Sequence, residues 1–125
     1  AVATYADFSN TIRLLGYSAQ AHNGALNLQL IWQAERTIGD QYHFYVHLVD
    51  DQGRTYSQQD GPPIAGAPAF TWATGQPLRA DAILAGPPAS QWGHYHLEVG
   101  WYDWRTNQHL LLANGSDHAT LPLPR

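Results

Sequence analysis

Histidines gather in two stretches of the sequence, and they are the side chains with the most evident capacity for chemistry. "YHFYVHLVD" contains His43 and His47, and "GHYHLEVGWYD" contains His94 and His96. Neutral imidazoles, with a carboxylate such as Glu98, can bind zinc or another divalent metal. If the two stretches are neighbouring strands, these four histidines are candidate metal ligands. The alternative is that they are ordinary polar residues on a solvated sheet face.

Acidic residues follow the first histidine pair, in "DDQG". Asp50, Asp51 and Gly53 are the residues that a type I turn with a following bulge requires, because Asp accepts hydrogen bonds from nearby backbone amides. A calcium site is the functional alternative, with Asp60 and Asp103 as further oxygen ligands. The spacing does not match the calcium-loop motif D-x-[DN]-x-[DN]-G, so we predict a hairpin turn.

Three of the five tryptophans lie beside loop residues instead of following a strand alternation. Trp72, Trp92 and Trp104 are therefore candidates for stacking on sugar rings, as exposed aromatic residues do at the rims of many β-sandwich modules. The alternative is that they close the ends of the hydrophobic core. Trp32 and Trp101 follow the alternation of core residues, and we expect them to be buried.

No catalytic constellation is evident in the chain. It has no Cys, no G-x-S-x-G, no phosphate-binding glycine loop and no H-E-x-x-H. Glu35 and Glu98 are the only glutamates, so a glycosidase pair would need an Asp. We therefore predict no catalytic residue, no cofactor and no enzymatic activity of this chain by itself.

Composition indicates one folded domain. The chain has 125 residues, of which 44% are hydrophobic and 13% charged. This is enough for one core but not for two. All six basic residues are Arg and the net charge is −4, which argues against a nucleic-acid partner. No apolar run reaches the roughly 20 residues of a membrane span, so we expect no direct membrane insertion. The absence of an initiator Met suggests a domain, residues 1–125, excised from a larger protein.

Alternation of apolar and polar residues predicts the secondary structure. In "LNLQLIWQ", Leu26, Leu28, Leu30 and Trp32 fall on one face, which is typical of a half-buried strand. Asn23-Gly24 is a strong signal for a two-residue hairpin. We predict seven or eight strands in an antiparallel β-sandwich, immunoglobulin-like or jelly-roll-like, with a small barrel as the alternative. Their approximate ranges are 10–19, 26–34, 42–50, 54–60, 79–85, 93–103, 108–114 and 117–123.

Prolines mark the predicted interruption of this pattern. Pro62-Pro63, Pro68 and Pro77 lack the backbone donor that a strand ladder requires. Residues 61–77 are therefore predicted to form a long ordered loop, held in place by Phe70 and Trp72.

Several segments together resemble a known kind of domain. "LNLQLIWQA", "FYVHLVDDQGRTYSQQDGPP", "WATGQPLRADAIL" and "GHYHLEVGWYDWRTNQHL" are similar to the C-terminal, extracytoplasmic β-sandwich domain of bacterial membrane glycosyltransferases. These parents are similar to protein O-mannosyltransferases. The resemblance covers roughly residues 10–113 and rests on pattern, not on a catalytic motif.

The resemblance implies a non-catalytic accessory domain on the extracytoplasmic side of a bacterial membrane, as part of a larger membrane protein. Its expected partners are a glycan or the membrane-embedded part of the parent protein. No catalytic residue is carried over, because the chemistry of such parents belongs to their membrane portion. A metal-binding module that uses the histidine-rich face is the alternative function.

Overall fold

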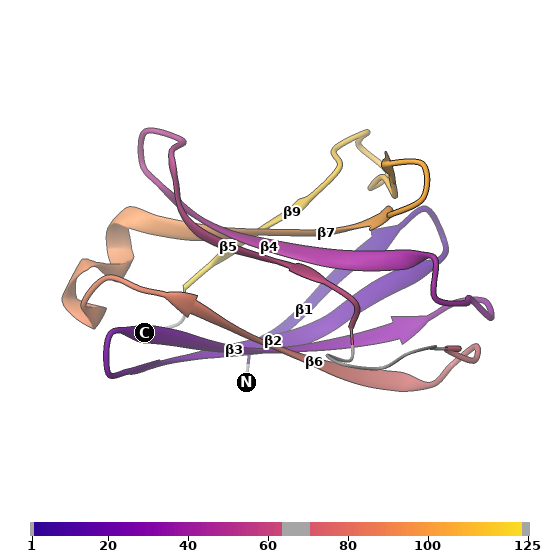
Figure 1. Cartoon of the computed structure of the whole chain (residues 1–125), viewed down its shortest axis with the longest axis horizontal. Helices are drawn as coiled ribbons and strands as arrows, with labels where there is room; N and C mark the ends of the chain where they lie inside the picture. The colour runs from indigo at the N-terminus through magenta and orange to yellow at the C-terminus, as the bar shows by residue number, and fades with distance from the viewer. Residues whose placement is uncertain (1, 64–70, 124–125) are drawn as a thin grey trace.

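Two antiparallel sheets packed face to face make up the computed structural model, which describes residues 2–63 and 71–123 (Figure 1). The predicted all-β antiparallel sandwich is confirmed. Nine strands and one short 3-10 helix occur in the described ranges: β1 Val2–Phe8, β2 Ile12–His22, β3 Ala25–Ala34, β4 Tyr42–Asp50, β5 Thr55–Gly61, β6 Pro77–Ala85, η1 Ala89–His94, β7 Tyr95–Asp103, β8 Gln108–His109 and β9 Ala119–Pro122. No helix in these ranges combines the length and hydropathy of a membrane span.

The first sheet has the order β1-β2-β3-β6. Its longest hairpin joins β2 and β3 through Asn23 and Gly24, whose φ angles of 50° and 77° are both positive. Such a turn matches the twist of the flanking strands, and Asn-Gly adopts it at low cost. The predicted hairpin at this dipeptide is therefore confirmed.

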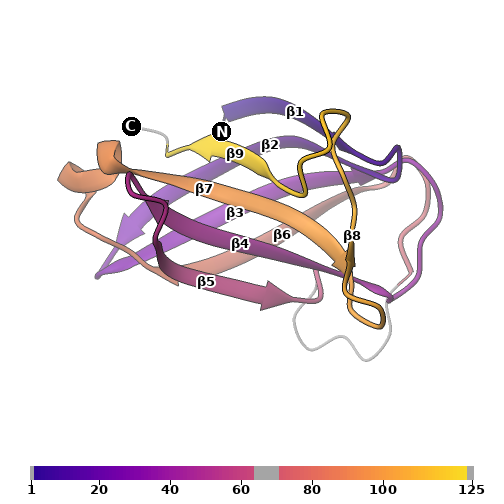
Figure 2. The same cartoon turned by 90° about the horizontal axis from the view of Figure 1, so that it is seen from above.

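The second sheet has the order β5-β4-β7-β8, and β9 also pairs with β7. Figure 2 shows β5, β4 and β7 side by side from above, with β8 and β9 beyond β7. The antiparallel register places His47 opposite Glu98 and His43 opposite Tyr102. The prediction that the two histidine-containing stretches are neighbouring strands is confirmed.

An aromatic cluster fills the space between the sheets. The ring centroid of Trp101 lies 5.1 Å from that of Trp32, 5.7 Å from Phe44 and 5.9 Å from Trp72, and all four side chains are buried. The leucines that alternate with polar residues in β3 are buried too, as predicted. Alternation works because successive side chains of a strand point to opposite faces.

Along one side of the sandwich, side chains of β5 form hydrogen bonds with backbone groups of β6 in the other sheet. The hydroxyl of Ser57 donates a hydrogen bond to the carbonyl oxygen of Ala85 (2.6 Å), and the amide of Ile83 donates to Gln59 Oε1 (3.1 Å). Strand β6 is an edge strand, and such contacts engage backbone groups that would otherwise be open to another chain.

The structure differs from the prediction in one additional strand and in the bounds of two predicted strands. Strand β1 was not predicted; it is joined to β2 through Ser9 and Asn10, whose φ angles are 56° and 52°. The predicted strand at 108–114 contracts to the two residues of β8, and 93–94 belong to η1 instead of a strand.

Pro77 starts β6 instead of preceding it, a position where a strand tolerates the missing donor. The predicted loop at 61–77 is thereby shortened at its end. Phe70, predicted to hold that loop, lies outside the described residues.

Candidate functional site

A concavity of about 550 Å³ lies on the outer face of the five-stranded sheet. Its floor is formed by side chains of β4, β5 and β7 that point away from the hydrophobic core. These are Tyr45 and His47 from β4, Asp60 from β5, and Glu98 and Tyr102 from β7. The register explains their convergence, because Tyr45 pairs with Asp60 on one side while His47 pairs with Glu98 on the other.

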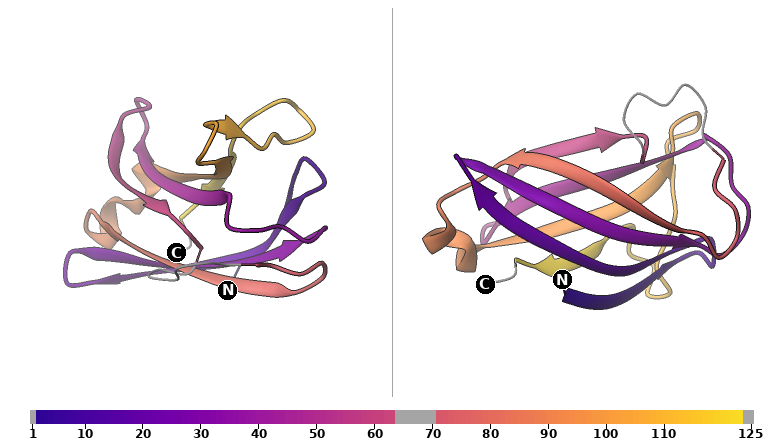
Figure 3. Two further views of the ribbon diagram at one scale, coloured as in Figure 1. Left: turned by 45° about the vertical axis from the view of Figure 1, so that its right-hand side comes forward. Right: turned by 90° about the horizontal axis from the view of Figure 1, so that it is seen from below.

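The segment after β7 forms the wall of the concavity with Asn107, His109, Asp117 and His118. Figure 3 shows this segment rising beyond the outer face of the five-stranded sheet, while its Leu110 and Leu112 pack against the core. Its return is completed by β9, which pairs with residues 96–99 of β7. The site therefore combines three adjacent strands with a connection that folds back over them.

A glycine in β7 lets this segment approach the sheet. A Cβ added at Gly100 would lie 2.5 Å from the Tyr45 hydroxyl oxygen and 2.7 Å from the carbonyl oxygen of Asp117. Tyr45 therefore occupies the position that a side chain at residue 100 would take. Its hydroxyl donates a hydrogen bond of 2.5 Å to that same carbonyl oxygen.

Tyr45 is buried, although the strand alternation directs it to the outer face. It is 7% exposed because the returning segment covers it. Burial, with the negative charges of Asp117, Glu98 and Asp60, raises the pKa of Tyr45 far above its ordinary value. Its hydroxyl thus stays protonated and acts as a hydrogen-bond donor.

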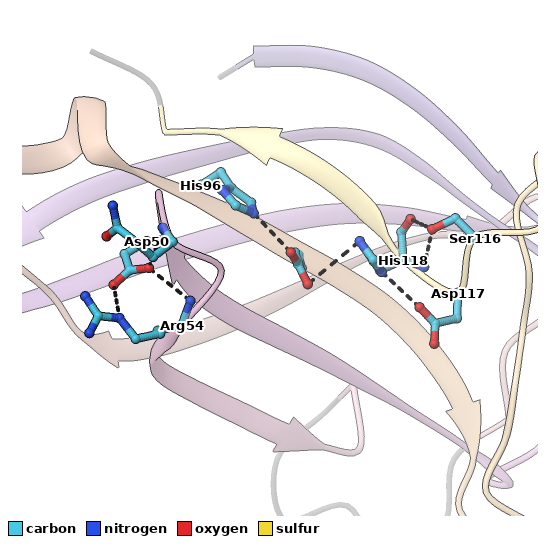
Figure 4. A network of polar contacts seen from close by, with 8 residues as sticks. Asp50, Arg54, His96, Ser116, Asp117 and His118 are labelled. Atoms are coloured by element: carbon cyan, nitrogen blue, oxygen red, sulfur yellow. Dashed lines mark hydrogen bonds and ion pairs between the residues drawn. The ribbon is translucent and has the colours of Figure 1, made fainter.

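Histidine–carboxylate contacts connect the floor to the wall. Glu98 Oε2 lies 3.0 Å from His96 Nε2, and Glu98 Oε1 lies 3.7 Å from His118 Nε2. His118 Nδ1 also lies 2.9 Å from Asp117 Oδ1, so the contacts run from His96 to Asp117 (Figure 4). A carboxylate oxygen only accepts hydrogen bonds, and His118 therefore donates to Asp117.

This contact determines how Asp117 titrates. The hydrogen bond from His118 lowers the pKa of Asp117 against the opposing effect of partial burial, and the charges of His109 and His118 lower it further. A fourth carboxylate–imidazole contact, 3.8 Å between Asp60 Oδ1 and His47 Nε2, lies on the β4–β5 side.

Aromatic and imidazole rings extend from the concavity along the sheet surface. The centroid of Tyr102 lies 5.8 Å from that of His109 and 5.9 Å from that of His43. The His43 ring in turn lies 5.9 Å from the ring of Trp104, which is 46% exposed. The outer face therefore offers ring surfaces next to hydrogen-bonding groups.

The four histidines predicted as metal ligands are not brought to one point. His47 contacts Asp60, His96 contacts Glu98, and His43 lies between Tyr102 and Trp104. His94 ends η1, with Nδ1 3.1 Å from Asp51 Oδ2, instead of continuing the outward row of β7.

The geometry of a metal centre is likewise missing from the described part of the chain. Nowhere in residues 2–63 and 71–123 do three His, Asp or Glu side chains lie in positions to hold one metal ion.

Two of the three tryptophans predicted to stack on sugars are core residues. Trp72 is fully buried and donates from Nε1 to the carbonyl oxygen of Gln76 (2.6 Å), while Trp92 is 7% exposed. The prediction of exposed rings is wrong for both, because η1 and the Ile38–Trp72 bridge turn them toward the core. Only Trp104 presents an exposed ring, and its Nε1 donates to the carbonyl oxygen of Asp40.

The acidic stretch after β4 is a hairpin turn, as predicted. Asp50 Oδ1 accepts hydrogen bonds of 2.9 Å from the amides of both Gln52 and Arg54, and Gly53 has a φ of 79°. These backbone hydrogen bonds, led by that from Arg54, lower the pKa of Asp50. Asp60 and Asp103, the other proposed calcium ligands, contact His47 and Arg105 instead.

Sequence reasoning placed the floor of the site and missed its wall. The outward positions of His47, Glu98 and Tyr102 follow from alternation. Nothing in the sequence indicated that His109 and His118 would return to the same face, because both lie in irregular segments or at strand ends.

A second hollow, of about 1060 Å³, lies at the other end of the molecule between β2 and η1. Although it is larger, alanines and glycine make up half of its lining. His94 is its one titratable residue among the described ones, and that side chain contacts Asp51. The smaller concavity is the better candidate because it concentrates the hydrogen-bonding and titratable groups.

No protein-family model matches the sequence, and no curated protein sequence matches it either. Among solved structures, the chain is similar to a beta-glucuronidase from glycoside hydrolase family 2, with a TM-score of 0.57 and 12% sequence identity. The match covers 88% of this chain but only 11% of that enzyme. A target of the Northeast Structural Genomics Consortium is matched over 93% of this chain and 84% of its own, at 13% identity, but a TM-score of 0.41 is too low to carry an argument. The comparison with the beta-glucuronidase supports the β-sandwich fold.

Proposed function

We propose that this chain is a non-catalytic accessory domain that binds carbohydrate in the concavity on the outer face of its five-stranded sheet. The observation that carries the proposal is the composition of that concavity. Tyrosine and imidazole rings lie beside carboxylates and an amide within about 550 Å³. Binding sites for small polar ligands combine apolar ring surface with a few fixed polar groups in this way.

The chemistry of a sugar suits this lining. A sugar ring has hydroxyl groups that both donate and accept hydrogen bonds, and an apolar face of C–H groups. Asp60 and Glu98 can accept from hydroxyls, Asn107 can donate and accept, and the Tyr102 ring offers apolar surface. Trp104 extends the ring surface through His43 and provides a second place for stacking.

The proposed context is a larger protein. The resemblance described above favours the extracytoplasmic part of a bacterial membrane glycosyltransferase, with the membrane-embedded portion of the parent as a second partner. The structural neighbour described above is a beta-glucuronidase, and the match covers 11% of that enzyme. A sandwich of this fold within a larger glycoside hydrolase is consistent with an accessory role, but the proposal does not rest on it.

The proposal is tested by NMR titration of the isotope-labelled chain with neutral oligosaccharides up to millimolar concentration. Amide shifts are expected to centre on Tyr45, Glu98, Tyr102 and His118. Tyr102→Ala is expected to weaken binding roughly fivefold, which corresponds to about 1 kcal/mol.

Gln29→Ala, on the outer face of the opposite sheet, is the matched control and should bind as the unmodified chain does. Absence of any shift at millimolar sugar, or shifts centred on the face of Gln29, would contradict the proposal.

A further inference from the structure

We propose that the concavity selects carbohydrates that carry a protonated amino group and rejects those that carry a carboxylate. This inference rests on the proposed function and specifies the class of ligand. It follows from the charges of the lining, the partners of those charges and the aromatic rings between them.

Negative charge is contributed to the concavity by three separate elements. Asp60 comes from β5, Glu98 from β7, and Asp117 from the segment that folds back over the sheet. No arginine is found among the described residues that line it. A negatively charged glycan would therefore meet carboxylates at close range without a fixed cation to compensate them.

The arginines of the described residues are engaged elsewhere. Arg54 pairs with Asp50 (3.2 Å), Arg79 with Asp81 (3.1 Å) and Arg105 with Asp103 (3.6 Å). Arg13 pairs with Glu35, and Arg36 donates to the carbonyl oxygen of Ser9. The carboxylates outside the concavity thus tend to have a permanent cation, whereas those inside have imidazoles.

An imidazole compensates a carboxylate only when it is protonated. His47 faces Asp60, and His96 and His118 face Glu98 from two elements, with His109 as a further lining residue. Histidine carries little positive charge at pH 7.5 and gains it as the pH falls below about 6.5. Neither Asp60 nor Glu98 has a permanent cation among its described contacts, so a cation supplied by the ligand can pair with these carboxylates.

Tyrosine rings complete a site for an ammonium group. Tyr102 lines the concavity, and burial, with the charge of Asp60, raises the pKa of its hydroxyl. Tyr45 lies next to it, with ring centroids 6.2 Å apart. The faces of such neutral rings attract cations, and the attraction adds to that of the carboxylates.

The test uses three forms of one sugar that differ at a single position. Methyl glucoside, its 6-amino-6-deoxy derivative and its 6-carboxylate derivative carry a hydroxyl, an ammonium and a carboxylate group at pH 7.5. The same three forms of methyl galactoside and methyl mannoside test whether the preference depends on the configuration of the sugar ring. Dissociation constants are measured by NMR titration at pH 7.5 and 5.5, and at 50 and 500 mM salt.

The amino form is expected to bind about tenfold more tightly than the hydroxyl form, and the carboxylate form more weakly than both. This advantage should shrink at 500 mM salt, because salt screens the charges. It should also shrink at pH 5.5, because imidazoles in general gain positive charge below about pH 6.5 and the rings of His43, His47, His96, His109 and His118 lie on this face.

Two near-isosteric substitutions, Glu98→Gln and Asp60→Asn, should each lower the affinity for the amino form more than the affinity for the hydroxyl form, so that the advantage of the amino form falls several-fold. Asp81→Asn, on the outer face of the other sheet, should not change it. Melting temperatures verify that each variant is folded.

Equal affinity for the amino and hydroxyl forms would overturn this inference and leave the proposed function intact. An advantage unaffected by both carboxylate substitutions would also overturn it. Failure of every form to bind would overturn the proposed function, and the inference with it.

Discussion

The two outer faces of the sandwich differ more than their sequences suggest. Both face away from the core, and along both of them polar residues recur at alternate strand positions, with exceptions such as Ile83 and Gly100. The face of the four-stranded sheet bears Gln29, the Arg79–Asp81 pair and Ile83, which is 66% exposed. The face of the five-stranded sheet is walled by Asn107, His109, Asp117 and His118 of the returning segment and buries Tyr45 on its outer side.

The difference shows what converts a polar sheet face into a site. A strand alternation can place histidines and carboxylates on a surface, but a flat surface leaves each of them in water. The returning segment adds a second set of titratable groups and buries Tyr45. Four substitutions examine this contrast, from the largest expected effect to the smallest.

Gly100→Ala is expected to have the largest effect, because it targets the contact between the sheet and the returning segment. The new methyl group would lie within 2.7 Å of atoms of Tyr45 and Asp117. We expect a loss of about 2–3 kcal/mol in the free energy of unfolding, measured by chemical denaturation.

Gly39→Ala is the control for Gly100→Ala. There the added Cβ would meet only the end of the Gln41 side chain, at 3.0 Å, which can move. If both variants unfold at the same denaturant concentration, the close approach at Gly100 is not the feature that holds the segment in place.

Tyr45→Phe is expected to cost about 1 kcal/mol at pH 7, because it leaves the Asp117 carbonyl oxygen without the tyrosine hydroxyl. The raised pKa of Tyr45 stabilises the fold below about pH 10, the ordinary tyrosine value, and this contribution is lost as the pH rises further.

Between pH 9 and 11 the variant should therefore lose less stability than the unmodified chain. Thermal unfolding at each pH measures this loss. Part of the loss should remain in the variant, since Tyr17 and Tyr102 also have raised pKa values. Identical alkaline profiles would show that Tyr45 is more accessible to water than its contacts indicate.

Asp117→Asn should have a smaller, pH-dependent effect. The lowered pKa of Asp117 stabilises the fold above about pH 4, the ordinary aspartate value, and the contribution disappears as the pH falls through the lowered value. The variant is expected to be less stable at pH 7 and to lose less stability between pH 5 and 3.

Asp81→Asn is the matched change on the other outer face, where the carboxylate pairs with Arg79 in the open. It should leave the acid profile nearly unchanged, because exposed ion pairs contribute little. A greater change for Asp81→Asn than for Asp117→Asn would contradict the contrast between the two faces.

Ile83→Thr should have the smallest effect, within about 0.5 kcal/mol, because the side chain is mostly exposed on the four-stranded sheet. It should leave carbohydrate binding unchanged in the titration described above. Loss of binding in this variant would indicate that the carbohydrate site lies on the face of the four-stranded sheet.

Much of the architecture could be predicted from the sequence, because strand periodicity and turn chemistry are local. The alternation of Leu26 to Trp32 identified a half-buried strand, and Asn23-Gly24 identified its hairpin. Strand β1 escaped prediction because its turn uses Ser9 and Asn10 in place of a recognisable Asn-Gly or Asp-Gly. This strand forms by pairing with β2, and the pattern of residues within 2–8 does not predict that pairing.

By itself, the sequence determined which residues of β4 and β7 face away from the core, since the two-residue period of a strand is a property of the local backbone. It also determined the Asp50 turn through the hydrogen bonds of one side chain. Only the tertiary structure decided that Trp72 is buried while Trp104 is exposed, and that His118 reaches Glu98 from 20 residues away in the chain. Such long-range placement depends on how the two sheets and the returning segment pack, and packing is a property of the whole chain.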